Sequence, residues 1–487
     1  MSATTCYAWA FPMLDAPEVA ERVQRRAGLA AGIAHMSVGA FHRAHQAAYV
    51  DEFLELEPGD WMIAGIGLLP GDAHMVRALD AQRCRYTLIE RSGSVDRARV
   101  ITSLCSIQHA PSDPARTIAT LADPVIRIVT LTVTEKGYYD DANGDLDTTR
   151  NEVRNDIDGV NAPVTGLGYL FEAAQQRMRT HGARFTVQSC DNRPGNGDLT
   201  RHVVLQLATE RDPAVAAWIA EHVSFPNSMV DRITPAIRPE TVEYVQTHFG
   251  GNDQCPVVSE AFRQWVIEDN FADGRPEYDR VGAQFVSSVH PYEIMKIRLL
   301  NGSHSALAYA GLLAGHTEVH VAMHDPALRS MVAGYMAEAR PTLDPVPGVD
   351  LDDYCATLVE RFSNPAIGDQ LARLAMDGSE KMRNFVVPAV EHNRVQGRPT
   401  PAGVLAVATW ATYLRATPVD QIDDPRAVTV SELARIGGDD LRALLRCEDV
   451  FGSRLAHDDA FADEVSAIVR VIESHGLAAA FGPRTPR

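Results

Sequence analysis

Short apolar runs rich in β-branched residues alternate with helical stretches through the first 290 residues. The apolar runs lie at 32–38, 61–68, 85–91, 127–133 and 185–190, and the helical stretches include 40–54, 74–82 and 202–223. Strands separated by helices predict a parallel, doubly wound sheet. Two further apolar runs, at 255–262 and 283–289, end this half of the chain.

Helical periodicity dominates from Tyr292 onward. The segments that carry it are 297–313, 326–339, 352–362, 402–416 and 463–481. Breaker-rich pieces at 340–350 and 377–388 lie between them and are interpreted as connections. The pattern therefore predicts an α/β domain over residues 1–290, followed by a mainly α-helical domain over residues 291–487.

Length and composition narrow the class of protein. A chain of 487 residues suggests two or three domains, and 45% hydrophobic with 22% charged residues is typical of a globular protein. The formal net charge of −19 argues against a nucleic-acid partner, because such binding needs clustered cations. The sequence contains no uncharged apolar stretch long enough to predict a membrane span. No signal peptide is expected at the N-terminus. Seven dispersed cysteines without a C-x2-C pair favour reduced thiols and a cytoplasmic location.

The pattern K-x4-N-x2-H interrupts an apolar helical segment with Lys296, Asn301 and His304. On a regular α-helix His304 lies roughly 80° from Lys296, and Asn301 lies roughly 60° beyond it. One helical face would then present an amine, an amide and an imidazole to a small ligand. Burying such groups without partners costs about 1–3 kcal/mol each, which favours a functional site. A buried helix with three satisfied polar groups remains the alternative on spacing alone.

The first predicted strand–turn–helix reads HMSVGAFHRAH. Of the dinucleotide fingerprint G-x-G-x-x-G only the middle glycine, Gly39, is present, and Ser37 and His42 take the outer positions. Gly39 stands where backbone must approach a pyrophosphate closely, with a helix N-terminus behind it, although a plain turn glycine fits the pattern too. Asp72, after the second strand, is a candidate for the ribose 2′-OH, which would favour NAD over NADP. A solvated loop acid is equally compatible with that position.

Six sequence blocks together resemble the polyol-specific long-chain dehydrogenases, the mannitol dehydrogenase family, over roughly residues 30 to 480. The blocks are VGAFHRAHQA (38–47), TVTEKGYY (132–139), SCDN (189–192), SFPNSMVDRITP (224–235), YEIMKIRLLNGSHSALAY (292–309) and RFSNPAIGDQL (361–371). The resemblance implies an α/β Rossmann-type N-terminal domain that binds NAD, a mainly α-helical C-terminal domain that binds substrate, and a site in the cleft between them. It also implies oxidation of a secondary alcohol without a metal.

The same resemblance assigns roles to residues at matching positions. The implied catalytic residues are Lys296 as general acid/base, Asn192, Asn301 and His304 as its neighbours, and Glu293 and Glu135 as a proton path. The implied substrate contacts are Asp231, Arg373 and Lys381. The cofactor-binding candidates are Ser37, Val38, Gly39, Ala40, Phe41, Asp72 and Thr134. Two departures from the family pattern stand out: Ser37 replaces a glycine that is usually retained, and Gly71 stands where relatives often have a second acid.

Alcohol oxidation without a metal requires a base that removes the hydroxyl proton. A lysine with an ordinary pKa of ~10.4 is protonated at neutral pH, whereas burial lowers that pKa. A positioned base contributes about 10²–10⁴-fold, and the amides of Asn192 and Asn301 can hydrogen-bond the developing oxyanion. A zinc enzyme is the rival class, but His42 and His45 are its nearest ligand cluster and lack a matching motif. The other rival class is a non-catalytic regulator that binds a dinucleotide.

The implied reaction is the reversible oxidation of D-mannitol to D-fructose, with NAD preferred and NADP weaker. D-arabinitol or sorbitol oxidation, and mannonate/fructuronate interconversion, are the alternatives within the family. The expected partners are a small polyol or ketose alone, with no nucleic acid, membrane or metal. A monomer or small homo-oligomer is expected.

Overall fold

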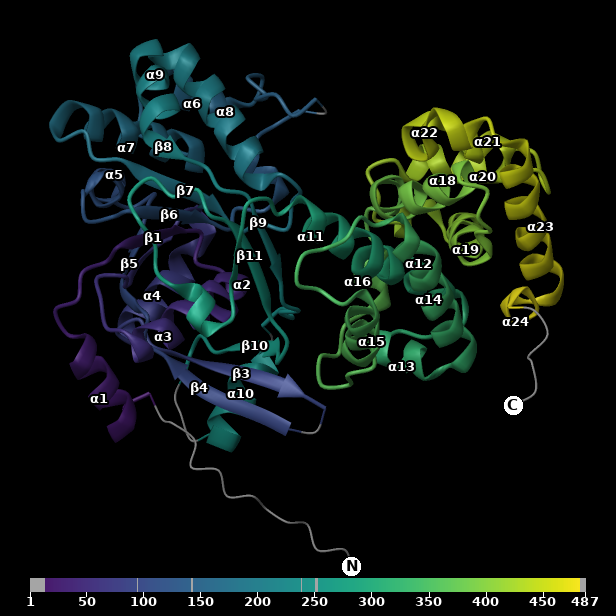
Figure 1. Cartoon of the computed structure of the whole chain (residues 1–487), viewed down its shortest axis with the longest axis horizontal. Coiled ribbons are helices and arrows are strands. Elements are labelled where there is room, and N and C mark those ends of the chain that lie inside the picture. Colours follow the sequence, from purple (N-terminus) through teal and green to yellow (C-terminus); the bar gives the residue numbers. More distant parts are fainter. Residues whose placement is uncertain (1–13, 94, 142, 238, 250–252, 482–487) are drawn as a thin grey trace, which may run out of the picture. The chain divides into compact units, whose positions relative to one another are not determined.

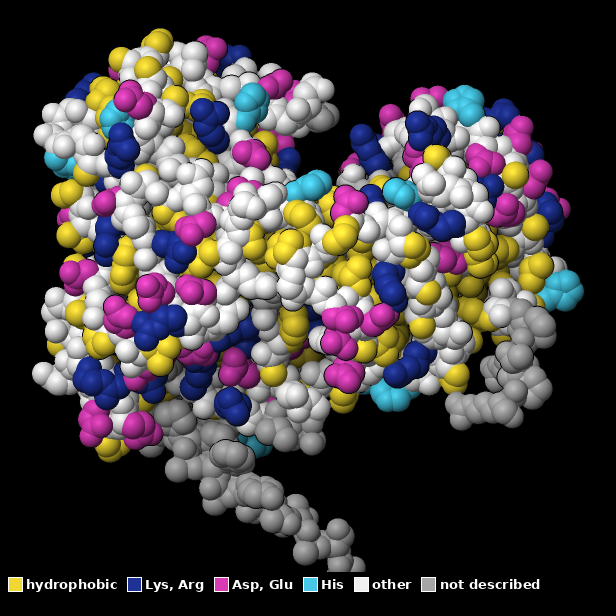
Figure 2. All heavy atoms as spheres, in the orientation of Figure 1, with side chains coloured by type: hydrophobic (Ala, Val, Ile, Leu, Met, Phe, Trp, Pro, Cys, Tyr) yellow, Lys and Arg dark blue, Asp and Glu magenta, His cyan; other side chains and the backbone are white. Residues whose placement is uncertain are grey.

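The computed structural model describes residues 14–481, apart from 94, 142, 238 and 250–252. Residues 1–13, from which no signal peptide is expected, lie outside this range. The chain divides into two compact units, residues 1–290 and residues 291–487. Basic and acidic side chains are interspersed over the surface of each unit in the face drawn in Figure 2.

A six-stranded parallel sheet forms the centre of the first unit (Figure 1). Its strands lie in the order β5 (Leu104–His109), β2 (Ile63–Gly67), β1 (Ile33–Met36), β6 (Ile128–Leu131), β7 (Phe185–Ser189) and β8 (Val223–Ser224). Ile33 on the central strand lies opposite Ile63 on one side and Ile128 on the other. Numbered along the chain, this is the 3-2-1-4-5-6 order of dinucleotide-binding folds. The predicted doubly wound sheet is confirmed.

Helices cover both faces of this sheet, which explains why its central strands are buried along their whole length. Tyr49, Phe53 and Leu79 belong to the core on one face. Leu121, Leu170 and Val203 belong to the core on the other. The helices of this unit are α1 (Pro17–Arg26), α2 (Ala40–Ala44), α3 (Gln46–Leu56), α4 (Ala73–Ala81), α5 (Pro114–Ala122), α6 (Asn151–Asp158), α7 (Gly166–Thr180), α8 (Asn196–Arg211), α9 (Pro213–His222) and α10 (Pro239–Phe249).

Strand β3 (Tyr86–Ser92), predicted as part of the parallel sheet, lies elsewhere. It pairs antiparallel with β4 (Val95–Ile101) and parallel with β10 (Val257–Glu260). A further small sheet contains β9 (Ser228–Asp231), β11 (Gln264–Glu268) and β12 (Gln284–Val286). The third strand of the parallel sheet is β5, whose sequence LCSIQH mixes polar with apolar residues because it lies at the edge.

Two helices predicted as continuous are interrupted. The stretch 40–54 breaks at His45, which has φ −109° and ψ −86° and whose Nε2 lies 2.9 Å from the carbonyl oxygen of Gln264. The stretch 202–223 breaks at Asp212, whose carboxylate accepts a hydrogen bond from the amide of Ala214 at 3.0 Å. Pro213 then begins α9, because proline lacks the N–H that a continuing helix needs.

The second unit is helical, as predicted, with α12 (Gly302–Leu313) packed against α19 (Pro401–Ala416). Residues 302–311 of α12 are all buried. The other α-helices are α11 (His290–Met295), α13 (Val319–His324), α14 (Pro326–Ala339), α15 (Leu351–Phe362), α16 (Leu371–Ala375), α17 (Gly378–Lys381), α18 (Val387–Val395), α20 (Ala427–Arg435), α21 (Arg442–Leu445), α22 (Glu448–Ala456), α23 (Asp459–His475) and α24 (Leu477–Ala480). In the described part of the chain, every helix is too short or too polar to cross a membrane.

Two π-helices distinguish this unit: η4 (Lys296–Asn301) and η6 (Met382–Val386). The segment 377–388, interpreted as a connection, is therefore helical. Pro388 accounts for η6, because its missing N–H and its ring disrupt the regular helix immediately before it. The angles expected for Lys296, Asn301 and His304 assumed a regular α-helix and are wrong over 296–301, where the wider i→i+5 turn applies.

Candidate active site

The turn that follows β1 has a strained backbone at Ser37. This residue has φ 74°, a region that glycine adopts freely and other residues rarely do. Its amide donates to the carbonyl of Ile66 at 2.8 Å, and its carbonyl accepts from Thr132 Oγ1 at 2.8 Å. The conformation expected of the first fingerprint glycine is thus present although the residue is serine.

Gly39 precedes α2 and leaves its backbone open to a ligand. A Cβ added there would meet only the Ser37 carbonyl oxygen, at 3.8 Å, so the protein's own packing does not require glycine. Val38 is buried, whereas Ala40 and Phe41 are half-buried in the first turn of α2. The turn lies at the carboxyl end of β1, between β2 and β6, where the strand order reverses and ligands bind in such sheets. These features fit a dinucleotide.

Asp72 ends a short 3-10 turn, Pro70–Asp72, after β2. Its Oδ2 accepts a hydrogen bond from the amide of Leu69 at 2.9 Å, so one carboxylate oxygen holds this turn closed. A Cβ added at Gly67 would lie 3.0 Å from Asp72 Cβ, which places Asp72 directly against the end of the strand. That is the location expected of a carboxylate that binds the ribose.

The loop after β6 carries Thr134 and Glu135, and a buried carboxylate holds it. Thr134 has φ 62°, an outlier for a β-branched residue, and both Thr134 and Glu135 are exposed. Asp191 accepts hydrogen bonds from the amides of Val133 at 3.0 Å and Thr134 at 2.9 Å, and from the Tyr138 hydroxyl at 2.8 Å. Burial raises the pKa of Asp191. Sequence reasoning quoted Asp191 within SCDN but gave it no role.

Asn192 follows Asp191 after β7 and is exposed. The loop around it is fixed by Asn196, whose side-chain amide donates to the carbonyls of Asp191 at 3.0 Å and Ser228 at 2.8 Å. Ser228 begins β9, and Asp231 ends it, 5% exposed. Asn196 therefore connects the segment of Asn192 with the strand that carries Asp231.

Lys296, Asn301 and His304 lie within one continuous helical stretch of the second unit. Lys296 is the first residue of η4 and is 7% exposed, Asn301 is its last residue, and His304 follows in α12 at 9% exposed. The His304 ring stacks on Phe362 with centroids 4.1 Å apart, which fixes the plane of the imidazole. Glu293, three residues before the lysine, is buried in α11.

Arg373 and Lys381 differ in their surroundings. The Arg373 guanidinium is exposed and makes two bonds to Asp369, at 2.8 and 2.6 Å. Lys381 is half-buried, and its Nζ donates to the carbonyl of Leu374 at 3.1 Å. Burial lowers the pKa of Lys381, while nearby Asp377 partly opposes the shift. Lys381 directly precedes η6, and η6 packs against η4.

The histidines considered as metal ligands serve in packing. The His42 ring stacks on His35 with centroids 3.5 Å apart, and His45 bonds to the backbone of Gln264. Both are fully buried. Among the residues that the structure describes, no group of three or more His, Cys, Asp or Glu side chains is arranged to hold a metal.

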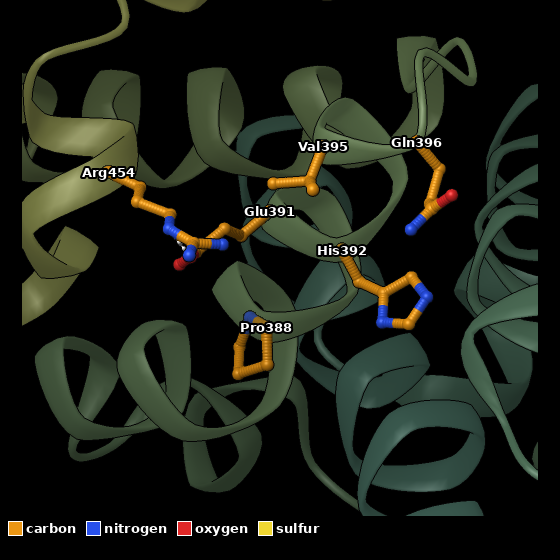
Figure 3. Close-up of a pocket in the computed structure, with 6 residues that line it drawn as sticks. All are labelled: Pro388, Glu391, His392, Val395, Gln396 and Arg454. Atoms are coloured by element: carbon orange, nitrogen blue, oxygen red, sulfur yellow. Dashed lines mark ion pairs between the residues drawn. The ribbon is translucent and has the colours of Figure 1, made fainter.

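A hollow of about 300 Å³ on the helical unit lies apart from these residues (Figure 3). Arg454 on α22 and Glu391 on α18 form an ion pair across it, at 3.7 Å. The residues that line it are Pro388, Glu391, His392, Val395, Gln396 and Arg454. None of them is a predicted site residue.

Comparisons with known proteins agree on one family. Residues 31–280 match the mannitol dehydrogenase Rossmann domain, and residues 288–473 match the mannitol dehydrogenase C-terminal domain. Mannitol dehydrogenase 2 of Saccharomyces cerevisiae is 41% identical over 464 residues, which cover 93% of this chain and 92% of the yeast protein. Mannitol 2-dehydrogenase of Aspergillus fumigatus is 41% identical over 467 residues, 93% of either chain.

Solved structures give the same result. The ternary complex of Pseudomonas fluorescens mannitol 2-dehydrogenase with NAD and D-mannitol has a TM-score of 0.81 and 41% identity, covering 93% of this chain and 94% of that one. A substrate-free D-sorbitol dehydrogenase has a TM-score of 0.87 and 35% identity, covering 93% and 95%. The resemblance predicted from the sequence blocks is confirmed: this chain belongs to the mannitol dehydrogenase family.

Proposed function

We propose that this protein is an NAD-dependent polyol dehydrogenase that oxidises D-mannitol at C2 to D-fructose and catalyses the reverse reduction. Family membership supports the reaction class, and the similar Pseudomonas fluorescens enzyme was crystallised with NAD and D-mannitol. The observation that carries the proposal is the buried residue Lys296, set with Asn301 and His304 in one helical stretch.

The first unit binds NAD in this proposal. Its support is the 3-2-1-4-5-6 strand order, the open backbone at Gly39 and the carboxylate of Asp72 against the end of β2. Ser37, Val38, Ala40, Phe41 and Thr134 complete the surface at the strand ends. Bound NAD supplies the hydride acceptor. Gly71 in place of a second acid leaves Asp72 as the residue that disfavours a 2′-phosphate, so NADP is the weaker cofactor.

Lys296 acts as the general base and takes the proton of the reacting hydroxyl. The uncharged form of the lysine amine is the form that accepts a proton. The side-chain amides of Asn192 and Asn301 donate hydrogen bonds to the oxygen as negative charge develops on it. His304, held in plane by Phe362, orients the substrate. In the reverse direction protonated Lys296 returns the proton to the ketose carbonyl.

The remaining residues handle the proton and the distal hydroxyls. Glu293 and Glu135 are carboxylates that pass the proton from a dry site to solvent. Asp231 accepts a hydrogen bond from a substrate hydroxyl, and Lys381 donates one. Arg373 serves as a weaker donor than Lys381, because its Nε and Nη2 already donate to the carboxylate of Asp369.

This pairing of Arg373 bears on the choice of substrate. A sugar acid such as mannonate needs an unpaired cation for its carboxylate, so the Arg373–Asp369 pair favours a neutral polyol. D-arabinitol is the second candidate because it has the same hydroxyl arrangement around the reacting carbon, and sorbitol follows it.

A substrate panel tests the proposal. Mannitol, arabinitol, sorbitol and mannonate are each offered with NAD and with NADP, and NADH formation is followed at 340 nm. The expected order of kcat/KM is mannitol, arabinitol, sorbitol, mannonate, with NAD above NADP. Absence of turnover with all neutral polyols would refute the proposal, and a preference for mannonate would assign the sugar-acid alternative.

We further propose that the enzyme works in the cytoplasm as a monomer or small homo-oligomer. The dispersed cysteines favour that compartment, since those in the described part of the chain form no disulfide. Light scattering coupled to size-exclusion chromatography measures the oligomeric state, and a mass above that of a tetramer would contradict it.

A further inference from the structure

We propose that Tyr335 is a positioning residue for Lys296, because it bridges η6 and Gly302, the residue that directly follows the π-helix η4 in which Lys296 lies. The inference rests on the proposed function, in which Lys296 is the base. Tyr335 lies on α14 and is 1% exposed. It carries no charge and was not predicted from sequence, yet it contacts η6 and the residue that directly follows η4.

The hydroxyl of Tyr335 reaches η6. It donates a hydrogen bond to the carbonyl oxygen of Phe385, at 3.1 Å, inside this π-helix. Pro388 follows η6 and has no N–H, so the regular ladder of backbone donors is incomplete there. The Tyr335 hydroxyl thus gives this irregular helical turn a side-chain donor from another helix. Burial raises the pKa of Tyr335, which keeps the phenol protonated as the donor.

The ring of Tyr335 packs against Gly302, just beyond the end of η4. Gly302 follows Asn301 directly, and a Cβ added to it would lie 2.3 Å from Tyr335 Oη and 2.8 Å from the ring carbon Cε1. Only glycine permits this contact. The same helix reaches η4 a second time just past its end, where Thr342 Oγ1 accepts a hydrogen bond from Arg298 Nη1 at 2.9 Å. η4 is thus held at its middle and at its end.

This arrangement matters for catalysis because a π-turn has an alternative. Reversion of η4 to a regular α-turn would shift the register by one residue and rotate Lys296 by about 100° relative to His304. A displacement of about 1 Å of a catalytic group can cost about a hundredfold in rate. Tyr335 opposes reversion by occupying the space beside Gly302 while bonded to η6.

The lysine content of the chain offers a direct readout. Its lysines are Lys136, Lys296 and Lys381, against a combined total of 45 lysines and arginines. Protein labelled with ¹³C at lysine Cε therefore gives three side-chain signals, and Lys296→Met assigns the one that belongs to Lys296. The titration of that signal reports the surroundings of the amine without any turnover.

The experiment compares Tyr335→Phe with Tyr169→Phe in the full-length protein. Tyr169 is a matched control, because it is equally buried and its hydroxyl donates to the backbone carbonyl of Ala110 at 3.2 Å. For Tyr335→Phe we expect kcat with mannitol to fall at least tenfold, the Lys296 titration midpoint to move by at least half a pH unit, and NADH affinity to stay within twofold. For Tyr169→Phe we expect wild-type kcat and an unchanged Lys296 midpoint.

Gly302→Ala gives a second test of the same contact, since its added methyl group displaces the Tyr335 ring. We expect the same direction of change in kcat and in the Lys296 midpoint. Wild-type kcat and an unmoved Lys296 signal in Tyr335→Phe would overturn the inference. A wild-type protein inactive with every polyol would refute the proposed function instead, and the Lys296 signal would still show whether Tyr335 positions the amine.

Discussion

The carboxylate of Asp191 accepts a hydrogen bond from the backbone amide of Thr134 at 2.9 Å, so one side chain joins the ends of the neighbouring strands β6 and β7. Its other oxygen accepts from the amide of Val133 and the hydroxyl of Tyr138. The strained backbone at Thr134 depends on these bonds, because φ 62° is unfavourable for threonine by about 1–3 kcal/mol. Asp191 thereby shapes the loop that carries the cofactor-binding candidate Thr134.

We therefore expect Asp191→Asn to weaken NADH binding at least tenfold. The substitution replaces one acceptor oxygen with an NH₂ group that faces backbone N–H donors, and the loop must move. Fluorescence titration with NADH measures the effect. Tyr138→Phe is the matched control, since it removes one of the three bonds and leaves both amides paired; we expect it to change NADH affinity less than threefold. Unchanged affinity in Asp191→Asn would contradict this role.

Lys296→Ala is expected to lower kcat by at least a hundredfold and to leave NADH affinity nearly unchanged. The reason is that the amine takes part in proton transfer, which contributes about 10²–10⁴-fold. Steady-state rates with mannitol and NADH titrations give both quantities. An equal loss of NADH binding and of rate would assign Lys296 to cofactor positioning.

Ser37 provides a test of backbone strain. We expect Ser37→Val to lower the free energy of unfolding by about 1–2 kcal/mol, because a β-branched residue at φ 74° is more strained than serine. Ser37→Gly is the paired variant and is expected to match or exceed the wild-type thermal midpoint, since glycine adopts this φ without steric cost. A lower midpoint for glycine than for valine would show that the turn is held by its serine.

Three buried imidazoles predict loss of stability in acid. Burial lowers the pKa of His35 and of His45 to about 3, and it lowers that of His42 well below its usual value. Below pH ~6.5 the unfolded chain protonates these rings while the folded chain does not, so stability is present above that pH and falls as pH drops toward 3. The slope is about 1.4 kcal/mol per pH unit for each proton.

Urea unfolding at pH 8, 6 and 5 measures this slope, and the urea midpoint is expected to fall steeply below pH 6.5. His74→Gln, a change at an exposed histidine, is the control and is expected to keep the wild-type slope. A midpoint independent of pH between 8 and 5 would contradict the assignment.

Removal of metal ions is expected to leave the reaction intact. The proposed base is an amine and the proposed oxyanion donors are amides, so no step needs a Lewis acid. Exhaustive dialysis against EDTA followed by the mannitol assay measures this, with a zinc alcohol dehydrogenase treated in parallel as a positive control. Activity lost on dialysis and restored by zinc would require a different mechanism.

Sequence periodicity predicts the buried elements of this fold well. The central strands β1, β2, β6 and β7 are buried along their whole length, and α14 begins as expected at Pro326, where Asp325 caps it. Edge strand β5 was missed because half-exposed strands mix polar and apolar residues. The break at His45 arises from a contact with Gln264, more than two hundred residues away, which local sequence does not encode.

Sequence reasoning singles out candidate site residues where side-chain chemistry is explicit. Lys296, Asn301 and His304 stand out as polar residues in an apolar helix, whereas Asp191 bonds mainly to backbone amides that no pattern reveals. The π-helix at Lys296–Asn301 contains no proline, and the close approach of Tyr335 to Gly302 just beyond it joins residues far apart in the sequence. Pro388 is a sequence signal for the π-helix η6, whereas η4 has no comparable signal.

The central position of β1 has a consequence for how the protein is made. Ile33 on this early strand requires Ile128 as a neighbour, and β6 leaves the ribosome only after four intervening strands. Until then one edge of an apolar strand has no partner, and such edges recruit other chains. Nascent chains that stall before residue 128 are therefore expected to depend on chaperones, and slower translation through residues 104–131 should raise the burden of misassembled protein.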